Sequence, residues 1–413
     1  MVARPKGPGC SPAGSIGRVA RLVRSSPVIG ALGCLSFLLI GWTGLLVPSL
    51  IRSVEHDFGQ SDAGVGIFYF LYALAYAGGS LGGGAVTERL GRRWVLALAA
   101  CLHGIGLAVL GTVPDWTVFL AAALPAGLGA GAIDGGINGL FLDLYRTSRG
   151  RALNTVHLFF SLGALASPLI VGRLVEAGIA WQVVVVGTAV GAFPVGALFA
   201  LTDPPHGRHE RPTTHRSAGA GLLALRWPLL ALEIAIGCYV ASEVGVSSWL
   251  VRFLDAAPLT LATTSLSLFW GGLALGRLVS ARIADRFDHL AFATACISVA
   301  SCALVAAVFV PSLPLSIALF AVVGFAFGPI FPVILAIAGE LFPARSAALG
   351  GLLTGAAVLG SILYPPVMGF LSVTVGLPAA MLGTALLGFA CATSLVLTGR
   401  RRGQLEAIES GQV

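Results

Sequence analysis

The sequence predicts an all-α polytopic membrane protein, and two observations support this fold class. Of the 413 residues, 56% are hydrophobic and only 10% are charged, far below the roughly 25% charged fraction of an ordinary soluble domain. In addition, apolar stretches of about 20 residues, the length that crosses a bilayer as a helix, recur twelve times. These expected transmembrane helices lie at residues 28–50, 63–86, 94–112, 116–142, 153–175, 181–202, 228–251, 260–283, 289–309, 314–338, 347–371 and 377–398.

The basic residues predict the orientation of these helices, because cytoplasmic loops retain Lys and Arg. With the N-terminus inside, 21 of the 25 Lys and Arg residues lie on the cytoplasmic side. Arg52, Arg173 and Arg252 lie outside, and Arg277 lies within a span. We therefore expect a multi-pass protein of the cytoplasmic (inner) membrane with both termini in the cytoplasm. This topology accounts for the net charge of +7, so the charge gives no reason to expect a nucleic-acid partner.

A polar, proline-punctuated stretch after the sixth span divides the chain into two six-helix bundles. It reads Asp203-Pro-Pro-His-Gly-Arg-His-Glu-Arg-Pro-Thr-Thr-His-Arg216, a composition that is typical of linkers. The expected organisation is a cytoplasmic N-terminal tail (1–27), an N-terminal bundle (28–202), a cytoplasmic linker (203–227), a C-terminal bundle (228–398) and a cytoplasmic C-terminal tail (399–413).

A weak internal repeat agrees with this division. The loop after the second span reads Gly84-Ala-Val-Thr-Glu88-Arg89-Leu-Gly91-Arg92-Arg93, and the loop after the eighth reads Ala281-Arg-Ile-Ala-Asp285-Arg286-Phe-Asp288. An acid, an arginine and a tight turn where two packed helices meet can form a charge relay that latches one conformation. The alternative is a basic cytoplasmic loop that happens to contain an acid. Both interpretations stay open for the second copy, which lacks the glycine and the basic pair.

Twelve spans in two sets of six, this loop and its degraded second copy resemble the major facilitator superfamily of secondary transporters. Three stretches are also similar to the branch of fucose, galactose and glucose proton symporters. They are Gly129-Ala-Gly131-Ala-Ile-Asp134-Gly-Gly-Ile-Asn138, Ala152-Leu-Asn154-Thr-Val-His157-Leu-Phe-Phe-Ser-Leu-Gly-Ala-Leu-Ala-Ser-Pro168, and Cys238-Tyr239-Val-Ala-Ser-Glu243-Val-Gly-Val-Ser-Ser-Trp249. The resemblance covers nearly the whole chain. It implies a functional monomer whose two helical bundles rock around a central site near the middle of the membrane.

The first span departs from this branch. Fucose symporters carry an acid in the first span as well as in the fourth, whereas the first span here reads Gly41-Trp42-Thr43-Gly44. This departure argues against a coupling scheme that needs two carboxylates in the N-terminal bundle.

Asp134 is the first candidate for a coupling site. It is the only charged residue in the fourth span, and a carboxylate at membrane depth must be protonated, paired or hydrated. Asn138 lies one turn further along the same helix face, and Asn154 and His157 begin the next span. We expect Asp134 to bind the coupling proton, while Asn138, Asn154 and His157 bind substrate hydroxyls or orient the acid. The alternative for Asn154 and His157 is that they only join helices.

The seventh span supplies a second candidate carboxylate. Glu243 lies near its centre with Tyr239 one turn earlier on the same face, and the resemblance places substrate contacts in this region. Aromatic rings beside carboxylates suit the apolar faces of a sugar, and Trp42 and Trp249 are the best candidates for such stacking. The alternative is that both tryptophans only pack the core or anchor the helices.

Two further polar residues within spans are expected to be structural. His103 stands alone on an apolar helix and is expected to be a core histidine with satisfied hydrogen bonds. Arg277 lies within a turn or two of the cytoplasm, where its side chain can extend to the membrane interface or pair with Asp285.

The leading hypothesis is proton-coupled uptake of a small polyhydroxylated solute such as a sugar. Sodium coupling stays open, because a buried carboxylate serves either ion. The alternative is proton-driven efflux of a drug or metabolite, although the stretch Ala122-Ala-Leu-Pro-Ala-Gly127 lacks the arginine that such exporters carry there. The expected partners are the solute, protons or sodium, and the lipid bilayer. The sequence contains no metal-ligand spacing or catalytic constellation, so no cofactor, metal site or enzymatic activity is expected.

Overall fold

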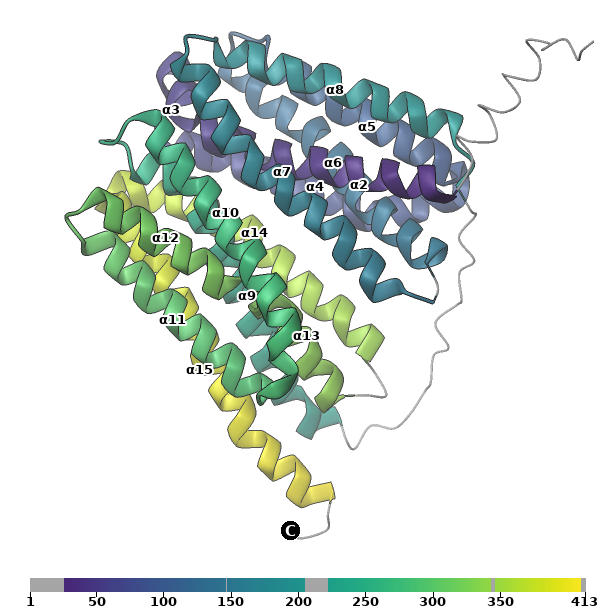
Figure 1. Cartoon of the computed structure of the whole chain (residues 1–413), viewed down its shortest axis with the longest axis vertical. Coiled ribbons are helices and arrows are strands. Elements are labelled where there is room, and N and C mark those ends of the chain that lie inside the picture. Colours follow the sequence, from purple (N-terminus) through teal and green to yellow (C-terminus); the bar gives the residue numbers. More distant parts are fainter. Residues whose placement is uncertain (1–25, 146, 205–221, 343–345, 410–413) are drawn as a thin grey trace, which may run out of the picture.

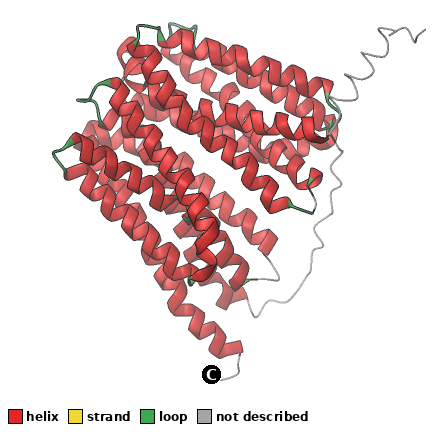
Figure 2. Cartoon of the chain, viewed as in Figure 1, coloured by secondary structure: helices red, strands yellow, loops and turns green. Residues whose placement is uncertain are grey.

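The structure, a computed structural model, describes residues 26–145, 147–204, 222–342 and 346–409. Helices dominate this part of the chain (Figure 2), and twelve helical spans within it are long and apolar enough to cross a membrane. Each of them coincides with one of the expected spans, so the prediction of an all-α membrane fold with twelve spans is confirmed.

The helices form an N-terminal and a C-terminal bundle (Figure 1). The N-terminal bundle contains α2 (Ser26–Gly44), α3 (Leu46–Phe58), α4 (Asp62–Leu90), α5 (Arg92–Leu110), α6 (Trp116–Leu144), α7 (Arg149–Glu176) and α8 (Trp181–Leu201). The C-terminal bundle contains α9 (Leu222–Phe253), α10 (Leu259–Ile283), the short helix η1 (Ala284–Arg286), α11 (His289–Phe309), α12 (Leu313–Phe327), α13 (Ile330–Leu341), α14 (Ser346–Val375) and α15 (Leu377–Glu409).

Two spans are broken into two helices each. The tenth span breaks at Pro329, which lacks the N–H that a continuous helix needs. The first span breaks at Leu45 and continues as α3 to Phe58, whereas the sequence predicted an end at residue 50. Arg52 and Glu55 therefore lie on a helix of the first span. The expectation that this span carries no acid was wrong, because the span is longer than its apolar core.

The two bundles contact each other at one end and diverge toward the other (Figure 1). We call the end that bears the loops 59–61, 111–115, 177–180 and 254–258 the closed end. The opposite end bears the loops at Gly91 and Asp288 and the start of α2. Across the interface α7 packs against α10 and α4 packs against α14. These contacts include Gly66 beside the backbone of Pro366, so the backbones of the two bundles approach each other closely near the closed end.

Close helix packing repeats between the bundles with a constant offset of 197 positions. In the N-terminal bundle, Gly131 lies against the carbonyl oxygen of Tyr76, and in the C-terminal bundle Gly328 lies against that of Leu273. A side chain at either glycine would overlap backbone atoms, and small residues are what lets membrane helices approach so closely. The same offset relates Gly127 beside Tyr72 to Gly324 beside Phe269, and Gly79 beside Leu128 to Gly276 beside Phe325.

We predict that Gly276→Leu destabilises the protein, because the new side chain would overlap the carbonyl oxygen of Phe325 and force α10 away from α12. Overpacking of this kind costs about 1–3 kcal/mol or more. The thermal midpoint of the purified protein in detergent should fall. Gly187→Leu is the matched control, because Gly187 is exposed and a Cβ there meets nothing within 4 Å. Equal losses in both variants would contradict the packing argument.

Candidate functional site

Asp134 in α6 is held by neutral hydrogen-bond donors. Asn138 Nδ2 donates to Asp134 Oδ1 over 3.0 Å, and the Tyr76 hydroxyl of α4 lies close enough to interact with the same carboxylate. Asn138 Oδ1 is buried and has no hydrogen-bond partner in the described part of the chain. Within the same residues we find no ion pair to Asp134, so this acid can take up or release a proton without breaking a salt bridge.

A second buried carboxylate, Glu243 in α9, is instead compensated by a cation. The Tyr239 hydroxyl donates to Glu243 Oε2. The Arg277 guanidinium of α10 lies close enough to interact electrostatically with both Tyr239 and Glu243. Tyr239 and Glu243 are buried and Arg277 is half-buried. An arginine this close offsets much of the cost of holding a carboxylate out of water.

The sequence allowed Arg277 either to extend to the membrane interface or to pair with Asp285, and the pairing was wrong. The Asp285 side chain is 98% exposed and lies 3.6 Å from His289 Nε2. Because α10 continues to Ile283, Arg277 lies nearly two turns inside the helix, where it interacts with Tyr239 and Glu243. The signal was present in the sequence as a charged residue within a span, a position that favours a functional role.

His157 and Asn154 are exposed on α7. The His157 ring packs edge to face against Phe37 of α2, with centroids 5.2 Å apart, and interacts electrostatically with Arg277 from the other bundle. His157 therefore faces the C-terminal bundle rather than Asp134. The polar residues thus form two groups: the Asp134 group (Asp134, Asn138 and Tyr76) and the Glu243 group (Tyr239, Glu243, Arg277 and His157).

The two candidate tryptophans lie outside both groups. Trp42 Nε1 donates to Thr188 Oγ1 over 3.1 Å, and Trp42 borders an apolar groove of about 560 Å³ between α2 and α8. Trp249 is fully buried, and its Nε1 donates to the carbonyl oxygen of Pro365 over 3.0 Å. Its ring meets Tyr69 of the N-terminal bundle at 5.6 Å between centroids. These contacts explain both residues as packing, and stacking on a substrate stays a proposal.

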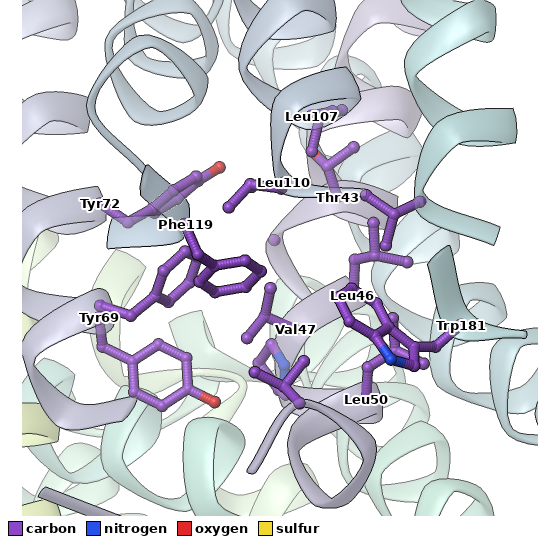
Figure 3. Close-up of a pocket in the computed structure, with 15 residues that line it drawn as sticks. Thr43, Leu46, Val47, Leu50, Tyr69, Tyr72, Leu107, Leu110, Phe119 and Trp181 are labelled. Carbon is purple, nitrogen blue, oxygen red and sulfur yellow. The ribbon is translucent and has the colours of Figure 1, made fainter. Parts of the chain in front are cut away.

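An enclosed cavity lies within the N-terminal bundle beside the break between α2 and α3 (Figure 3). Its volume is about 40 Å³, and apolar side chains such as Leu107 and Phe119 line most of it. That space holds a few waters at most, whereas ligand sites span roughly 300–1,000 Å³, so this cavity is not the substrate site. Beside it, His103 contacts Thr43 Oγ1 at 3.1 Å and the Ala126 carbonyl oxygen at 2.7 Å. The prediction of a satisfied core histidine is confirmed.

The expected gating loop turns at Gly91, whose φ of 78° suits only glycine. Arg92 Nη2 lies 2.5 Å from Asp143 Oδ2 at the end of α6. Arg93 stacks over the Trp94 ring at 4.9 Å, and Arg89 is exposed. The surroundings of Gly84 and the side chain of Glu88, both singled out in the sequence, lie outside what the structure describes.

The second copy of the loop carries a side-chain contact at the equivalent positions. His289 Nδ1 lies 2.5 Å from Glu340 Oε1 at the end of α13, and the two residues are separated by 51 positions, as Arg92 and Asp143 are. A histidine thus replaces the arginine of the first copy at the same offset of 197. Asp285 and Arg286, the expected pair, are both exposed instead.

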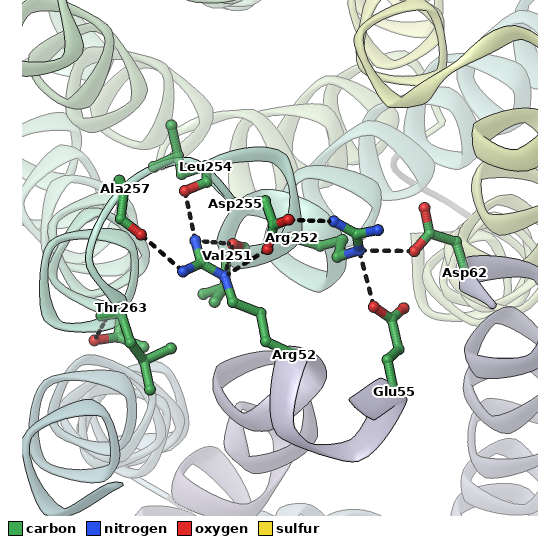
Figure 4. A network of polar contacts seen from close by, with 10 residues as sticks. Arg52, Glu55, Asp62, Val251, Arg252, Leu254, Asp255, Ala257 and Thr263 are labelled. Carbon is green, nitrogen blue, oxygen red and sulfur yellow. Dashed lines mark hydrogen bonds and ion pairs between the residues drawn. The ribbon is translucent and has the colours of Figure 1, made fainter. Parts of the chain in front are cut away.

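Ion pairs at the closed end join the two bundles (Figure 4). Arg252 Nε lies 2.8 Å from Glu55 Oε2 and 2.9 Å from Asp62 Oδ1, and its Nη1 lies 3.0 Å from Asp255 Oδ2. Arg52 donates to the carbonyl oxygens of Val251, Leu254 and Ala257 over 2.5–3.1 Å. We call Arg52, Glu55, Asp62, Arg252 and Asp255 the closed-end cluster. The sequence showed two of its residues only as external arginines, because no local pattern reveals pairing between distant helices.

Comparison with known proteins identifies the fold. The sequence profile of the Major Facilitator Superfamily matches residues 31–348 and 235–412. The uncharacterised MFS-type transporter YfkL of Bacillus subtilis is 22% identical over 87% of this chain and 94% of its own length. The glucose/mannose transporter GlcP of the same organism is 21% identical over 72% and 75%. The puromycin resistance protein pur8 of Streptomyces alboniger is 32% identical over 55% and 45%.

Solved structures agree with this assignment. A bacterial homologue of the human lysosomal transporter Spinster superposes with a TM-score of 0.75 at 16% identity, covering 91% of this chain and 97% of the other. The fucose:proton symporter FucP of Escherichia coli superposes with a TM-score of 0.59 at 19% identity, covering 91% and 99%. At these identities the likeness concerns the fold alone.

We predict that Arg277→Met lowers the thermal midpoint of the purified protein, because Glu243 then lacks its cation. Leaving a buried acceptor uncompensated costs about 1–3 kcal/mol, and the loss should shrink at acidic pH, where Glu243 binds a proton instead. The double variant Glu243→Gln/Arg277→Met should recover most of the stability. Arg282→Met is the control, because Arg282 is exposed on the same helix and bonds only to the Leu278 carbonyl oxygen in the contacts described. A loss as large in this control would refute the pairing.

Proposed function

The chain belongs to the Major Facilitator Superfamily, and from this premise we propose that it takes up a small polyhydroxylated solute, such as a sugar, together with a proton. It is a multi-pass membrane transporter with twelve spans. The orientation that we propose places both termini in the cytoplasm, in the inner membrane of a bacterial cell, because the arginine-rich loops lie at the end opposite the closed end. The closed end then faces outward.

The neutral surroundings of Asp134 carry the proposal that this residue binds the transported proton. An ionised carboxylate within a span is costly unless its charge is offset. Tyr76 and Asn138 supply hydrogen bonds but no charge, so protonation changes the stability of the site without dismantling it. Glu243 is unsuited to this role, because its proton would compete with Arg277.

The Glu243 group is our candidate for substrate binding. It offers a carboxylate, a phenolic hydroxyl and a guanidinium within one cluster, which matches hydroxyl groups that both donate and accept hydrogen bonds. His157 and Arg277 approach each other from opposite bundles, so a solute bound there can contact both. Asn154 and the unpartnered Asn138 Oδ1 are further candidate contacts.

The difference between the two ends of the molecule suggests how access to the site alternates. The closed-end cluster joins the bundles on the outer side, whereas the bundles diverge on the inner side (Figure 1). Outward opening requires these ion pairs to break. The side-chain contacts Arg92–Asp143 and His289–Glu340 each lie within one bundle, and we propose that they hold the gating loops in register while the bundles rock.

Asp134→Asn tests the proton assignment. In de-energised, lightly buffered cells without sodium, sugars that are substrates should make the medium alkaline for the wild type and not for the variant. Exchange of labelled against unlabelled sugar should persist in the variant, because the new amide side chain would keep its hydrogen-bonding neighbours. Asp115→Asn is the control: Asp115 caps α6 at its exposed start, and asparagine caps helices equally well. Alkalinisation by the Asp134→Asn variant would rule out this residue as the proton carrier.

Proton-driven efflux is the second candidate function, because the relatives include the puromycin resistance protein of Streptomyces alboniger and multidrug resistance protein D of Escherichia coli. The same assay separates the two functions. A proton flux elicited by cationic drugs, with silence across a panel of sugars, would favour efflux.

Arg252→Gln should open the outer end, because Glu55 and Asp62 then face each other without their cation. Spin labels at the exposed loop residues Thr112 and Ser312 report the separation of the bundles there. We expect the population with a long distance to rise about tenfold or more, which corresponds to at least ~1.4 kcal/mol. Arg173→Gln is the control, because Arg173 is also at the closed end, is exposed, and bonds to the Leu169 carbonyl oxygen of its own helix. An unchanged distance distribution in Arg252→Gln would contradict the latch.

A further inference from the structure

One nitrogen of Arg252 faces two carboxylates in the closed-end cluster. Arg252 Nε lies 2.8 Å from Glu55 Oε2 and 2.9 Å from Asp62 Oδ1 (Figure 4). This nitrogen carries a single hydrogen, and the hydrogen bond that it makes goes to Asp62 Oδ1. Glu55 Oε2 therefore lies beside the Asp62 carboxylate without receiving a hydrogen from Arg252 Nε.

The second oxygen of Glu55 also lacks a hydrogen-bond donor. Glu55 Oε1 is buried without a hydrogen-bond partner among the described residues. Because Glu55 Oε2 and Asp62 Oδ1 both approach the same nitrogen, two negative charges lie close together there unless one acid is protonated. Both residues are more than nine-tenths buried, at 9% and 6% exposed, beside an open polar pocket of about 430 Å³ that Asp62, Arg252 and Asp255 line.

The charged neighbours on every packed element are already engaged. Arg52 of α3 donates to three backbone carbonyls and approaches Asp255 at 3.2 Å. Asp255, after α9, adds a third negative charge near the two arginines. His56, one residue from Glu55, is exposed and contacts Asp57 instead.

The neutral polar neighbours do not supply the missing charge either. The Tyr69 hydroxyl of α4 donates to the Ser248 carbonyl oxygen, and the Ser372 hydroxyl of α14 donates to Asp62 Oδ2. Three carboxylates thus surround two arginines, which leaves one negative charge over unless an acid is neutral.

We propose that Glu55 and Asp62 share one bound proton while the closed end is shut, which makes the pair a second proton site, separate from Asp134. The proton supplies the missing hydrogen between the two acids and brings the cluster to neutrality. When the end opens, the pair separates, water hydrates both groups, and the proton leaves to the solution on that side. Closure of this end is therefore linked to proton uptake from that side.

The sign of the linkage follows from this. At acidic pH the proton is bound and closure is stable. As the pH rises, deprotonation leaves two ionised carboxylates at one N–H, and closure weakens. For one proton, the ratio of open to shut molecules changes by at most tenfold for each pH unit. This linkage rests on the geometry of the cluster and needs neither a sugar nor Asp134, so it stands or falls independently of the proposed uptake.

Infrared difference spectroscopy of the purified protein tests the site directly. A protonated carboxyl group absorbs apart from carboxylates, and its band shifts when the exchangeable hydrogen is replaced by deuterium. Glu55→Gln and Asp62→Asn should each remove the same band, because one proton belongs to the pair. Asp57→Asn is the matched control on α3, because Asp57 accepts hydrogen bonds from Trp181 and Gln182 and should leave the band in place. Persistence of every carboxyl band in both variants would overturn the proposal.

A second measurement has its decisive outcome in the protein with an intact cluster, so it also covers the case in which a variant fails to fold. Spin labels at Thr112 and Ser312 report the outer separation from mildly acidic to mildly alkaline pH, without any solute. The open population should rise with pH, by no more than tenfold per unit, and Glu55→Gln should abolish this dependence, because its amide supplies the missing hydrogen. A distance distribution that is independent of pH in the protein with an intact cluster would overturn the proposal.

Discussion

The cost of placing charge within a membrane-spanning bundle is the constraint on which this structure depends. The protein meets it in three ways. Asp134 is surrounded by neutral donors, Glu243 is compensated by Arg277, and the closed-end cluster gathers two arginines and three acids across the interface. These arrangements differ in what they allow. An acid whose charge is offset by an arginine favours a fixed geometry. An acid held only by neutral donors, or one acid more than the arginines can offset, can instead bind and release a proton.

The helix packing lets each bundle move as a unit, so a change at one end of the molecule affects the other end. Glycines at matching positions of the two bundles let backbones touch, as at Gly131 and Gly328, so each bundle packs as a unit. Contacts between the bundles combine close packing, as at Gly66 and at Tyr69, with ion pairs at the closed end, where Arg252 meets Glu55 and Asp62. Rigid bundles joined by breakable ion pairs are what a rocking transporter requires.

Most of the fold was predictable from the sequence, because twelve apolar spans and the distribution of arginines leave few alternatives. Span ends were less predictable: the first helix continues through Arg52 and Glu55, since polar residues at the membrane boundary hide the helix from a hydropathy pattern. The internal repeat was visible at Glu88 and Asp285 only as a faint likeness, and the structure shows the same offset in helix packing and in the pairs of Arg92 and His289.

The candidate site was predictable in part. The acids Asp134 and Glu243 stood out because charge in a span is rare, and Asn138 and Tyr239 followed from helical spacing. Tyr76 did not, because its partner lies on another helix and no local spacing connects them. Arg277 stood out as a charge within a span, but its partners on α9 did not follow from the sequence. Trp42 and Trp249 looked alike in sequence and have different surroundings in the structure.

We propose that Asp134 carries the charge that moves with the solute, and electrical recording from proteoliposomes on a solid support measures that charge. On addition of a transported sugar in sodium-free buffer, we expect a transient of positive charge moving with the sugar, which disappears in Asp134→Asn while sugar binding persists. An unchanged transient in that variant would show that the moving charge resides on another group.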